Sequence, residues 1–275
     1  MTNRVDLNAY LERIDYRGPR TPGLSLLAEL QRRHIATIPF ENLSPFLGLE
    51  VELSPQGLER KLIDQKRGGY CYEHNLLFKN ILEQLGFQVS GLGARVLWEQ
   101  PYTARPAVSH MLLRVTLDEV DYLVDTGFGA LTPTAPLRLD RVGPQETAHE
   151  PYRVLHLNDH FLLEAYAGNG WKTLYRFDLR ELWQADYEMA SWYLSHHPQS
   201  HFVTNLVACR ADADGRRNLN NQRLSIYPPG GERQRRTLSS VAEVLAVLEQ
   251  EIGLRLPDHP ALERRVADLL AAGAG

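Results

Sequence analysis

The chain has 275 residues, of which 43% are hydrophobic and 23% charged, with a formal net charge of -4 and a pI near 6.2. This charge offers no long-range attraction for a phosphate backbone, so we expect no nucleic-acid partner. No stretch approaches the roughly 20 apolar residues of a membrane span. The opening MTNRVDLNAYLERIDY is also too polar for a signal peptide, which predicts a cytoplasmic protein without a membrane partner. The two cysteines, Cys71 and Cys209, are too few for a disulfide framework.

Residues 1–85 carry the spacing of amphipathic helices and predict an N-terminal helical bundle. Asn3 and Asp6 are candidates to cap a first helix, and Pro22 opens a second. Ser54 is a candidate N-cap for a third helix, because a proline follows at the first helical position.

From residue 86 the apolar period changes from helical to two, in short runs separated by Gly, Pro and Asp. Residues 86–190 therefore predict a central antiparallel β-barrel. Residues 191–275 mix strand patterns such as HFVTNLVACR with two helical segments, and predict an α/β lid; the polar stretch 210–222 is expected to be a surface turn. The whole chain is thus predicted to be an α+β, multidomain protein, as its length also favours.

Cys71 follows Gly68-Gly69 and is predicted to lie in the first turn of a helix that ends at Gly86. A cysteine acts as a nucleophile in its thiolate form, which unpaired helix N–H groups favour only weakly. A histidine held as an imidazolium is the usual further source of stabilisation. The main-chain N–H groups around Cys71 are candidates to bind an oxyanion.

The segment SHMLLRVTLDEVDYLVDTGFG predicts a β-hairpin whose polarity fixes its register. With a two-residue turn at 118–119, Leu113 pairs with Val124, and one face is wholly apolar. On the other face His110 becomes a diagonal neighbour of Asp125, about 7–8 Å away at the backbone and within side-chain reach. We therefore predict a triad with Cys71 as nucleophile, His110 as base and Asp125 as the group that orients the imidazole.

These residues lie in motifs that resemble those of a known enzyme family. The segment RGGYCYEHN at 67–75 resembles the RGGxCxExN signature of the arylamine N-acetyltransferases. Four further segments resemble motifs of the same family in the same order: IPFENL at 38–43, Ser109-His110, VDTGFG at 124–129, and SWYLS at 191–195. The likeness extends from about Asp6 into the last third and weakens after about Cys209.

The resemblance implies a cysteine-protease-like Cys-His-Asp core and a ping-pong reaction. An acetyl group would pass from acetyl-CoA to the same triad cysteine and then to an arylamine or hydrazine, in xenobiotic metabolism. Acetyl-CoA would be a cosubstrate, with no tightly bound cofactor, and the protein would be a monomer or homodimer. We assign the following residues on this basis: to the CoA site, Gly127, Phe128, Gly129, Trp98 and Ser109; to the acceptor pocket, Phe40 and Tyr72; and to structural support near the site, Arg67, Gly68, Gly69, Glu73 and Asn75.

Other interpretations stay open. An amide synthase or a thiol hydrolase could use the same triad. We expect Cys209 to be structural, His74 to be a packing or hydrogen-bonding residue, and Arg67 and Glu73 to form a buried ion pair. No metal is predicted, since the spacing of the histidines at 196, 197 and 201 matches no usual ligand pattern. The stretch 101–106 differs from what the family leads us to expect, so the acceptor stays unassigned.

Overall fold

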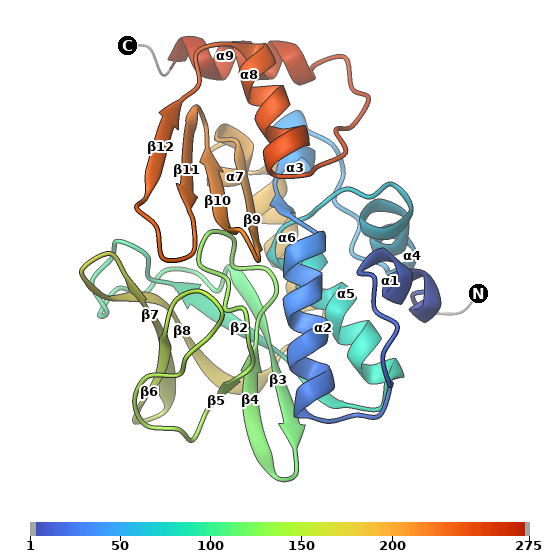
Figure 1. Ribbon diagram of the computed structural model, residues 1–275, viewed down its shortest axis with the longest axis vertical. Coiled ribbons are helices and arrows are strands. Elements are labelled where there is room, and N and C mark those ends of the chain that lie inside the picture. Colours follow the sequence, from blue (N-terminus) through green and yellow to red (C-terminus); the bar gives the residue numbers. More distant parts are fainter. Residues whose placement is uncertain (1–3, 273–275) are drawn as a thin grey trace.

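A computed structural model describes residues 4–272, and its first third is helical (Figure 1). Asp6 caps the first helix by accepting hydrogen bonds from the N–H groups of Asn8 and Ala9, whereas Asn3 lies outside the described residues. Ser54 accepts a hydrogen bond from the N–H of Gly57 at 3.1 Å, as its predicted capping role requires. The helices are α1 Leu7–Arg13, α2 Leu24–Thr37, α3 Leu43–Leu47, α4 Pro55–Leu58, the π-helical η1 Glu59–Asp64, and α5 Cys71–Gln84.

The middle third forms a seven-stranded antiparallel sheet that curls into a nearly closed barrel. Its order is β5-β4-β3-β2-β8-β7-β6. Gln145 links the two edge strands: its backbone pairs with Tyr152, while its side-chain amide bonds both the N–H and the carbonyl of Arg138 at 2.9 Å. The strands are β2 Gln88–Val96, β3 His110–Leu117, β4 Val120–Val124, β5 Leu137–Arg138, β6 Tyr152–Leu157, β7 His160–Ala167 and β8 Gly170–Glu181.

The predicted hairpin register is confirmed. Leu113 pairs with Val124, and Leu117 pairs with Val120 at the turn. Asp118 and Glu119 occupy that turn with φ values of 48° and 62°, the backbone that a two-residue hairpin turn requires. This register brings His110 and Asp125 to the same end of the sheet.

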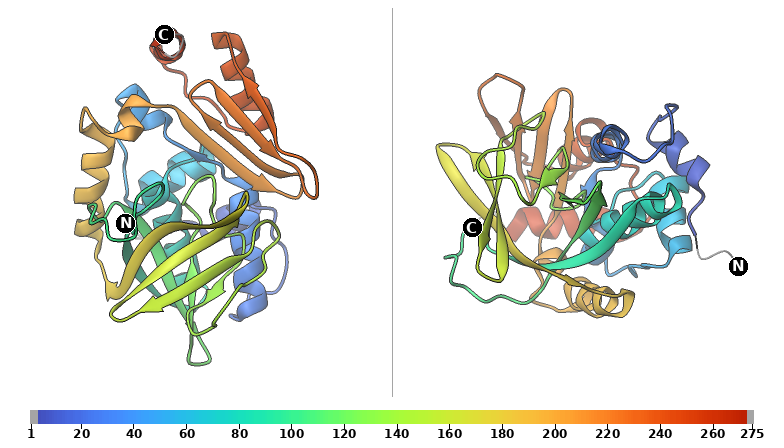
Figure 2. Two further views of the ribbon diagram at one scale, coloured as in Figure 1. Left: turned by 90° about the vertical axis from the view of Figure 1, so that its left-hand side faces the viewer. Right: turned by 90° about the horizontal axis from the view of Figure 1, so that it is seen from below.

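The last third builds a second sheet in the order β1-β9-β10-β11-β12, with helices beside it (Figure 1). Strand β1 comes from the N-terminal third, since Phe40 pairs with Cys209 and Glu41 with Ala208. The helix α6 lies along one flank of the molecule (Figure 2). The elements are β1 Phe40–Glu41, α6 Gln184–His196, α7 His201–Thr204, β9 Val207–Asp212, β10 Gly215–Asn220, β11 Arg223–Tyr227, β12 Gln234–Thr237, α8 Val241–Ala246, the π-helical η2 Val247–Glu251, and α9 Leu262–Ala272.

Two predictions for this region are wrong. The first half of HFVTNLVACR is the helix α7, because Ser200 caps it by accepting a hydrogen bond from the N–H of Phe202 at 3.3 Å. The polar stretch 210–222 is largely strand, with tight turns between β9, β10 and β11. Long-range pairing overrides the polar pattern there.

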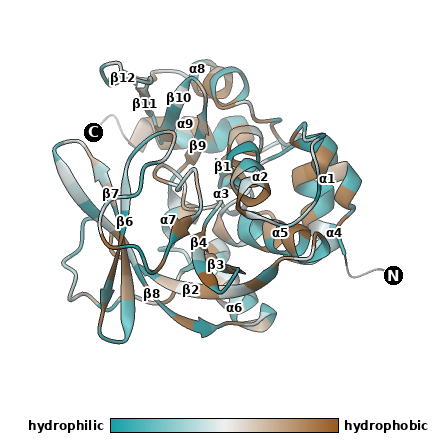
Figure 3. Ribbon diagram, turned by 60° about the horizontal axis from the view of Figure 1, so that its bottom comes forward, coloured by the Kyte–Doolittle hydropathy of each residue, from teal (hydrophilic) through white to brown (hydrophobic). Residues whose placement is uncertain are grey.

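Three buried clusters hold these parts together. One packs α1, α2 and α5 against the outer face of β3, and a second fills the barrel interior. The third lies between the C-terminal sheet and its helices. Figure 3 shows brown apolar and teal polar residues on both α1 and α5, as amphipathic helices require. The division into 1–85, 86–190 and 191–275 stays a prediction.

None of the helices within residues 4–272 is long and apolar enough to cross a membrane.

Candidate active site

Cys71 is the first residue of α5, at the junction of the helices and the barrel. Its N-cap neighbour Tyr70 donates its N–H to the Glu73 carboxylate at 3.0 Å, which fixes the start of the helix. The Cys71 side chain is a free thiol and is 3% exposed, with Sγ 4.0 Å from the carbonyl oxygen of Ser109. The N–H groups of the first helical turn have no acceptor within the helix, so they favour negative charge at this position.

His110 opens β3 and contacts both other members of the predicted triad. Its Nε2 lies 2.7 Å from Asp125 Oδ2, which leaves Nδ1 to face Cys71. Burial alone would lower the pKa of His110. The charge of Asp125 and the hydrogen bond to it, with smaller contributions from Cys71, outweigh burial and raise the pKa from 6.5 to about 10. The buried pair therefore favours an imidazolium.

Asp125 is fully buried and its carboxylate accepts four hydrogen bonds. Oδ2 accepts from His110 and, at 3.0 Å, from the hydroxyl of Tyr175. Oδ1 accepts from the side-chain amide of Asn75 at 3.2 Å and from the N–H of Gly127 at 2.9 Å. Burial would raise the pKa of Asp125, but His110 and these donors lower it overall. The carboxylate is thus held as an anion in one orientation.

Asn75 also ties the triad to the fold. Its amide nitrogen donates to the carbonyl of Met111 at 2.8 Å, and its oxygen accepts from the N–H of Thr126 at 3.1 Å. One side chain on α5 thereby joins β3 to the segment after β4. This contact explains how the helix that carries Cys71 is fixed relative to the strands that carry His110 and Asp125.

The turn at 127–129 packs against the nucleophile. A Cβ at Gly127 would lie 2.8 Å from Cys71 Cα, so any side chain there would displace the start of α5. The ring of Phe128 lies 5.2 Å from that of His110, between centroids. Gly129 has a φ of 89° and approaches the ring of Phe40. The proposed contacts of this turn with CoA stay predictions.

Comparison with known proteins shows which family the chain resembles. A family model described as N-acetyltransferase matches residues 23–261. An arylamine N-acetyltransferase of Mycobacterium bovis is 44% identical over 98% of both chains. One of Escherichia coli is 40% identical over 92% of this chain and 90% of its own.

The chain belongs to the arylamine N-acetyltransferase family. It is therefore an acyltransferase. The solved structure of the Mycobacterium marinum arylamine N-acetyltransferase shares its fold, with a TM-score of 0.92 and 42% identity, covering 96% of this chain and 100% of that one. A structure of the same enzyme in complex with CoA gives a TM-score of 0.91 at 41% identity, covering 96% and 99%.

The ion pairs of the motif at 67–75 differ from the prediction. Arg67 does not pair with Glu73: it donates to Glu41 at 2.9 Å, while Glu73 pairs with Lys61 at 2.6 Å. The predicted Arg67–Glu73 ion pair is wrong because the Glu73 side chain turns back to its own helix start. A Cβ at Gly68 would lie 2.0 Å from the carbonyl oxygen of Pro39, so only glycine fits beside β1. A Cβ at Gly69 would likewise meet the Glu73 carboxylate at 2.8 Å.

His74 belongs to a buried chain of hydrogen bonds. The carbonyl of Pro39 can only accept, so Nε2 of His74 donates to it at 3.2 Å. Nδ1 of His74 then accepts from His34 at 2.8 Å, and His34 accepts from the hydroxyl of Tyr10 at 3.0 Å. Burial lowers the pKa of His74 to about 4 and that of His34 well below 6.5. Both imidazoles are therefore neutral, in keeping with the predicted hydrogen-bonding role of His74.

A cavity of about 390 Å³ reaches the triad, and we call it the catalytic pocket. Tyr72 and His110 line it, and α6 contributes Tyr187 and Met189. The hydroxyls of Tyr72 and Tyr187 are buried and have no hydrogen-bond partner within the described residues. Of the other residues predicted here, Trp98 is 42% exposed just after β2. The sequence did not predict α6, although its Asp186 caps the helix start by accepting the N–H of Trp183 at 2.8 Å.

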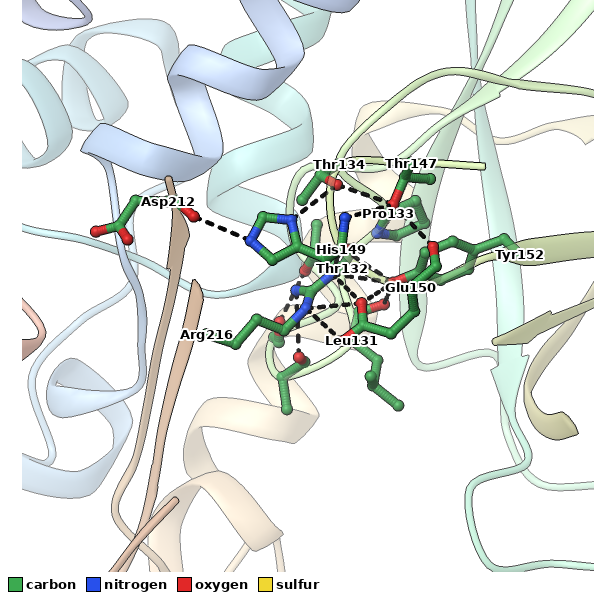
Figure 4. Close-up of polar contacts among 12 residues, drawn as sticks. Leu131, Thr132, Pro133, Thr134, Thr147, His149, Glu150, Tyr152, Asp212 and Arg216 are labelled. Carbon is green, nitrogen blue, oxygen red and sulfur yellow. Dashed lines mark hydrogen bonds and ion pairs between the residues drawn. The ribbon is translucent and has the colours of Figure 1, made fainter. Parts of the chain in front are cut away.

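A polar junction between the two sheets holds the loop that follows the 127–129 turn (Figure 4). Arg216 on β10 is 2% exposed and pairs with Glu150 at 2.7 Å. The same guanidinium donates to the carbonyl of Thr132 at 2.9 Å and to the hydroxyl of Tyr152 at 3.1 Å. The C-terminal sheet thus fixes the loop through one buried arginine. The sequence placed Arg216 in a surface turn, and no local signal marked it.

Within residues 4–272, no group of three or more His, Cys, Asp or Glu side chains is placed to hold a metal ion.

Proposed function

We propose that the protein transfers an acetyl group from acetyl-CoA, through a thioester on Cys71, to the nitrogen of an arylamine or hydrazine. The observation that carries this proposal is the buried His110–Asp125 pair at 2.7 Å beside a free thiol at a helix N-terminus. A cysteine, a charged imidazole and an orienting carboxylate are the three parts that Cys–His acyl transfer requires.

The reaction proceeds in two halves. His110 takes the proton of the Cys71 thiol, and the sulfur attacks the acetyl carbonyl of the donor; the carbon–sulfur bond to CoA breaks, and His110 returns a proton to the departing CoA sulfur. The amine nitrogen then attacks the Cys71 thioester, His110 accepts a proton from that nitrogen, and the cysteine is released. In each tetrahedral intermediate the oxyanion is placed to accept hydrogen bonds from the first-turn N–H groups of α5.

His110 is an imidazolium beside the free Cys71 and a neutral base beside the acetylated one. Part of what raises its pKa is the neighbouring Cys71. Acetylation removes that contribution, so the imidazole becomes easier to deprotonate and acts as the base that the second half needs. Asp125 keeps its four hydrogen bonds throughout and holds the ring in place.

Acetyl-CoA as donor is supported by a relative of the same fold whose structure was solved in complex with CoA. An aromatic acceptor is supported by the catalytic pocket, because its apolar and aromatic walls suit a flat ring and its volume of about 390 Å³ suits a small molecule. We place the reaction in the cytoplasm, where both thiols stay reduced.

The test combines two readouts on the wild type and on Cys71→Ser. Incubation with acetyl-CoA should add one acetyl group to the wild-type mass and none to the variant. Release of CoA should become catalytic only when an arylamine is present. Cys209→Ser is the matched control, since Cys209 is buried in β9 and burial raises its pKa to about 12.

Equal CoA release with and without amine would instead identify a hydrolase. Failure to accept acetyl-CoA, with labelling by a carrier-bound acyl chain, would identify an amide synthase. An acetylated Cys71→Ser chain would overturn the nucleophile assignment itself.

A further inference from the structure

A buried glutamine from the N-terminal helices closes the loop that follows β4. Gln31 lies on α2 and is fully buried. Its side-chain amide nitrogen donates to the main-chain carbonyl of Asp125 at 3.2 Å and to that of Pro133 at 2.8 Å. These two residues are the ends of a segment that contains the 127–129 turn, and we call it the 125–133 loop. One side chain, 94 and 102 residues away in the chain, therefore ties the two ends of this loop together.

The two donated hydrogen bonds fix which way the amide of Gln31 points. Rotation of the amide by half a turn would bring its oxygen against two carbonyl oxygens, which would repel it. In the observed orientation both N–H bonds are used, whereas Oε1 is buried and accepts no hydrogen bond from the described residues. A buried polar atom without a partner is destabilising, and an apolar side chain would avoid it. Gln31 instead supplies two donors, and within residues 4–272 no other donor reaches either carbonyl.

The 125–133 loop contacts the imidazole of His110 at two points. At the start of the loop, the Asp125 carboxylate lies 2.7 Å from His110 Nε2 and accepts a hydrogen bond from the N–H of Gly127 at 2.9 Å. Further along, the ring of Phe128 lies 5.2 Å from the His110 ring and 5.1 Å from that of Tyr175, between centroids. A movement of the loop would thus reach His110 through both the carboxylate and the aromatic ring.

Two other side chains hold the later part of the loop. Arg216 and Tyr152 donate to main-chain carbonyls at 130–132, at distances of 2.9 to 3.3 Å (Figure 4). Neither of them binds the carbonyl at either end of the loop. Gln31 therefore holds a part of the loop that they leave unsupported.

We propose that Gln31 is a positioning residue of the acetyl transfer, because it closes the 125–133 loop and so holds Asp125 and Phe128 in place beside His110. Its hydrogen bonds go to main-chain atoms of the loop rather than to a triad side chain, so it acts through the loop. A misplacement of about 1 Å in a reacting geometry can slow a reaction roughly a hundredfold, so release of both loop ends should be visible in the rate. The inference rests on the proposed function, since it concerns the geometry of the same triad.

The test compares Gln31→Met with Gln84→Met, since methionine is similar in size to glutamine but has no donor. Acetylation of Cys71 is followed by intact mass over a range of acetyl-CoA concentrations. The rate at saturation should be about tenfold lower in Gln31→Met, with little change in the half-saturating concentration. Gln84→Met should keep the wild-type rate, because Gln84 donates to the main-chain carbonyl of Val5 at 2.9 Å and lies at the opposite end of α5 from Cys71. A Gln31→Met chain that is less stable but keeps the saturating rate would overturn the positioning role.

A second variant, Gln31→Glu, tests the hydrogen-bond donors themselves. Burial and the two facing carbonyl oxygens should keep the new carboxyl protonated near neutral pH, and a protonated carboxyl can donate to one of the two carbonyls. At about pH 6 the saturating rate of Gln31→Glu should therefore lie between those of the wild type and Gln31→Met. It should fall to the Gln31→Met rate or below as the pH rises, because an ionised carboxylate donates no hydrogen bond. Equal rates for Gln31→Glu and Gln31→Met at every pH would overturn the role of the donors.

An NMR measurement without any acyl donor separates this inference from the proposed function. The ring current of Phe128 contributes to the chemical shift of the His110 Cε1–H, because the two rings are in contact. Release of the loop should move this signal at pH 7.5 in Gln31→Met and leave it in place in Gln84→Met. If the signal moved as expected but the wild type never became acetylated, the hold of Gln31 on the loop would stand and the acetyl transfer would fall. An unmoved signal in Gln31→Met would overturn the inference.

Discussion

Asp125→Asn isolates the interaction that sets the charge of His110. The pKa of His110 rises from 6.5 to about 10 against the effect of burial, and the two largest contributions that raise it come from Asp125. At about 1.36 kcal/mol per pH unit, this difference corresponds to roughly 5 kcal/mol in favour of the imidazolium. An asparagine removes that charge while burial continues to lower the pKa. We therefore expect the pKa of His110 to fall below 6.5 in the variant, and the imidazole to be neutral at pH 7.5.

Two measurements check this. NMR titration of the His110 ring, with its signal assigned from a His110→Gln variant, should give a midpoint near 10 in the wild type and below 6.5 in Asp125→Asn. The rate of acetylation by acetyl-CoA, followed by intact mass, should fall by roughly 10⁴-fold, as in another triad whose carboxylate becomes an amide. Asp121→Asn is the matched control, because Asp121 lies on the same hairpin but accepts from Thr116 at 2.6 Å. A midpoint that stays near 10 without the Asp125 carboxylate would refute the reasoning.

Three further predictions concern the support of the site. Arg216→Met should lower the free energy of unfolding, measured in urea, by roughly 3 kcal/mol, because it leaves Glu150 unpaired in a largely buried junction. Adding Glu150→Gln should recover part of that loss. If the effects of the two substitutions were purely additive, this coupling would be contradicted. Gly127→Ala should slow acetylation about tenfold or more, since its Cβ would lie 2.8 Å from Cys71 Cα, while Gly170→Ala, with open space around it, should have no effect on the measured rate. The pH dependence of urea unfolding should show greatest stability near pH 6.5. The pKa of His110 is raised in the folded protein, so its contribution to stability is complete below pH 6.5 and is lost as the pH rises toward 10. The pKa of His74 is lowered in the folded protein, so its contribution to stability is complete above pH 6.5 and is lost as the pH falls toward 4. Stability that rises steadily from pH 6.5 to 10 would contradict the His110 assignment.

Local patterns were sufficient for the parts of the site that depend on neighbouring residues. The start of α5 at Cys71 follows from the preceding glycines and the helical spacing after it. The pairing of Leu113 with Val124 follows from a two-residue turn and an apolar face, since a shift by one residue would turn that face to solvent. The hairpin register places His110 and Asp125 on one side of the sheet.

Contacts between distant segments were not predictable in the same way. Tyr175, which donates to Asp125, lies on β8, a strand that the alternation did not reveal. Arg67 pairs with Glu41 rather than with Glu73, because β1 brings Glu41 beside it. In each case the partner lies many residues away in the chain.

The sequence by itself determined the local helices, strands and turns and which of them carry the triad residues. Helical period, strand period and turn chemistry act over a few neighbouring residues. Only the tertiary structure decided that Arg216, in a polar stretch, would be buried against Glu150, and that Tyr175 on β8 would donate to Asp125. Burial and charge pairing depend on which surfaces meet, and that is set by the packing of whole sheets and helices against one another.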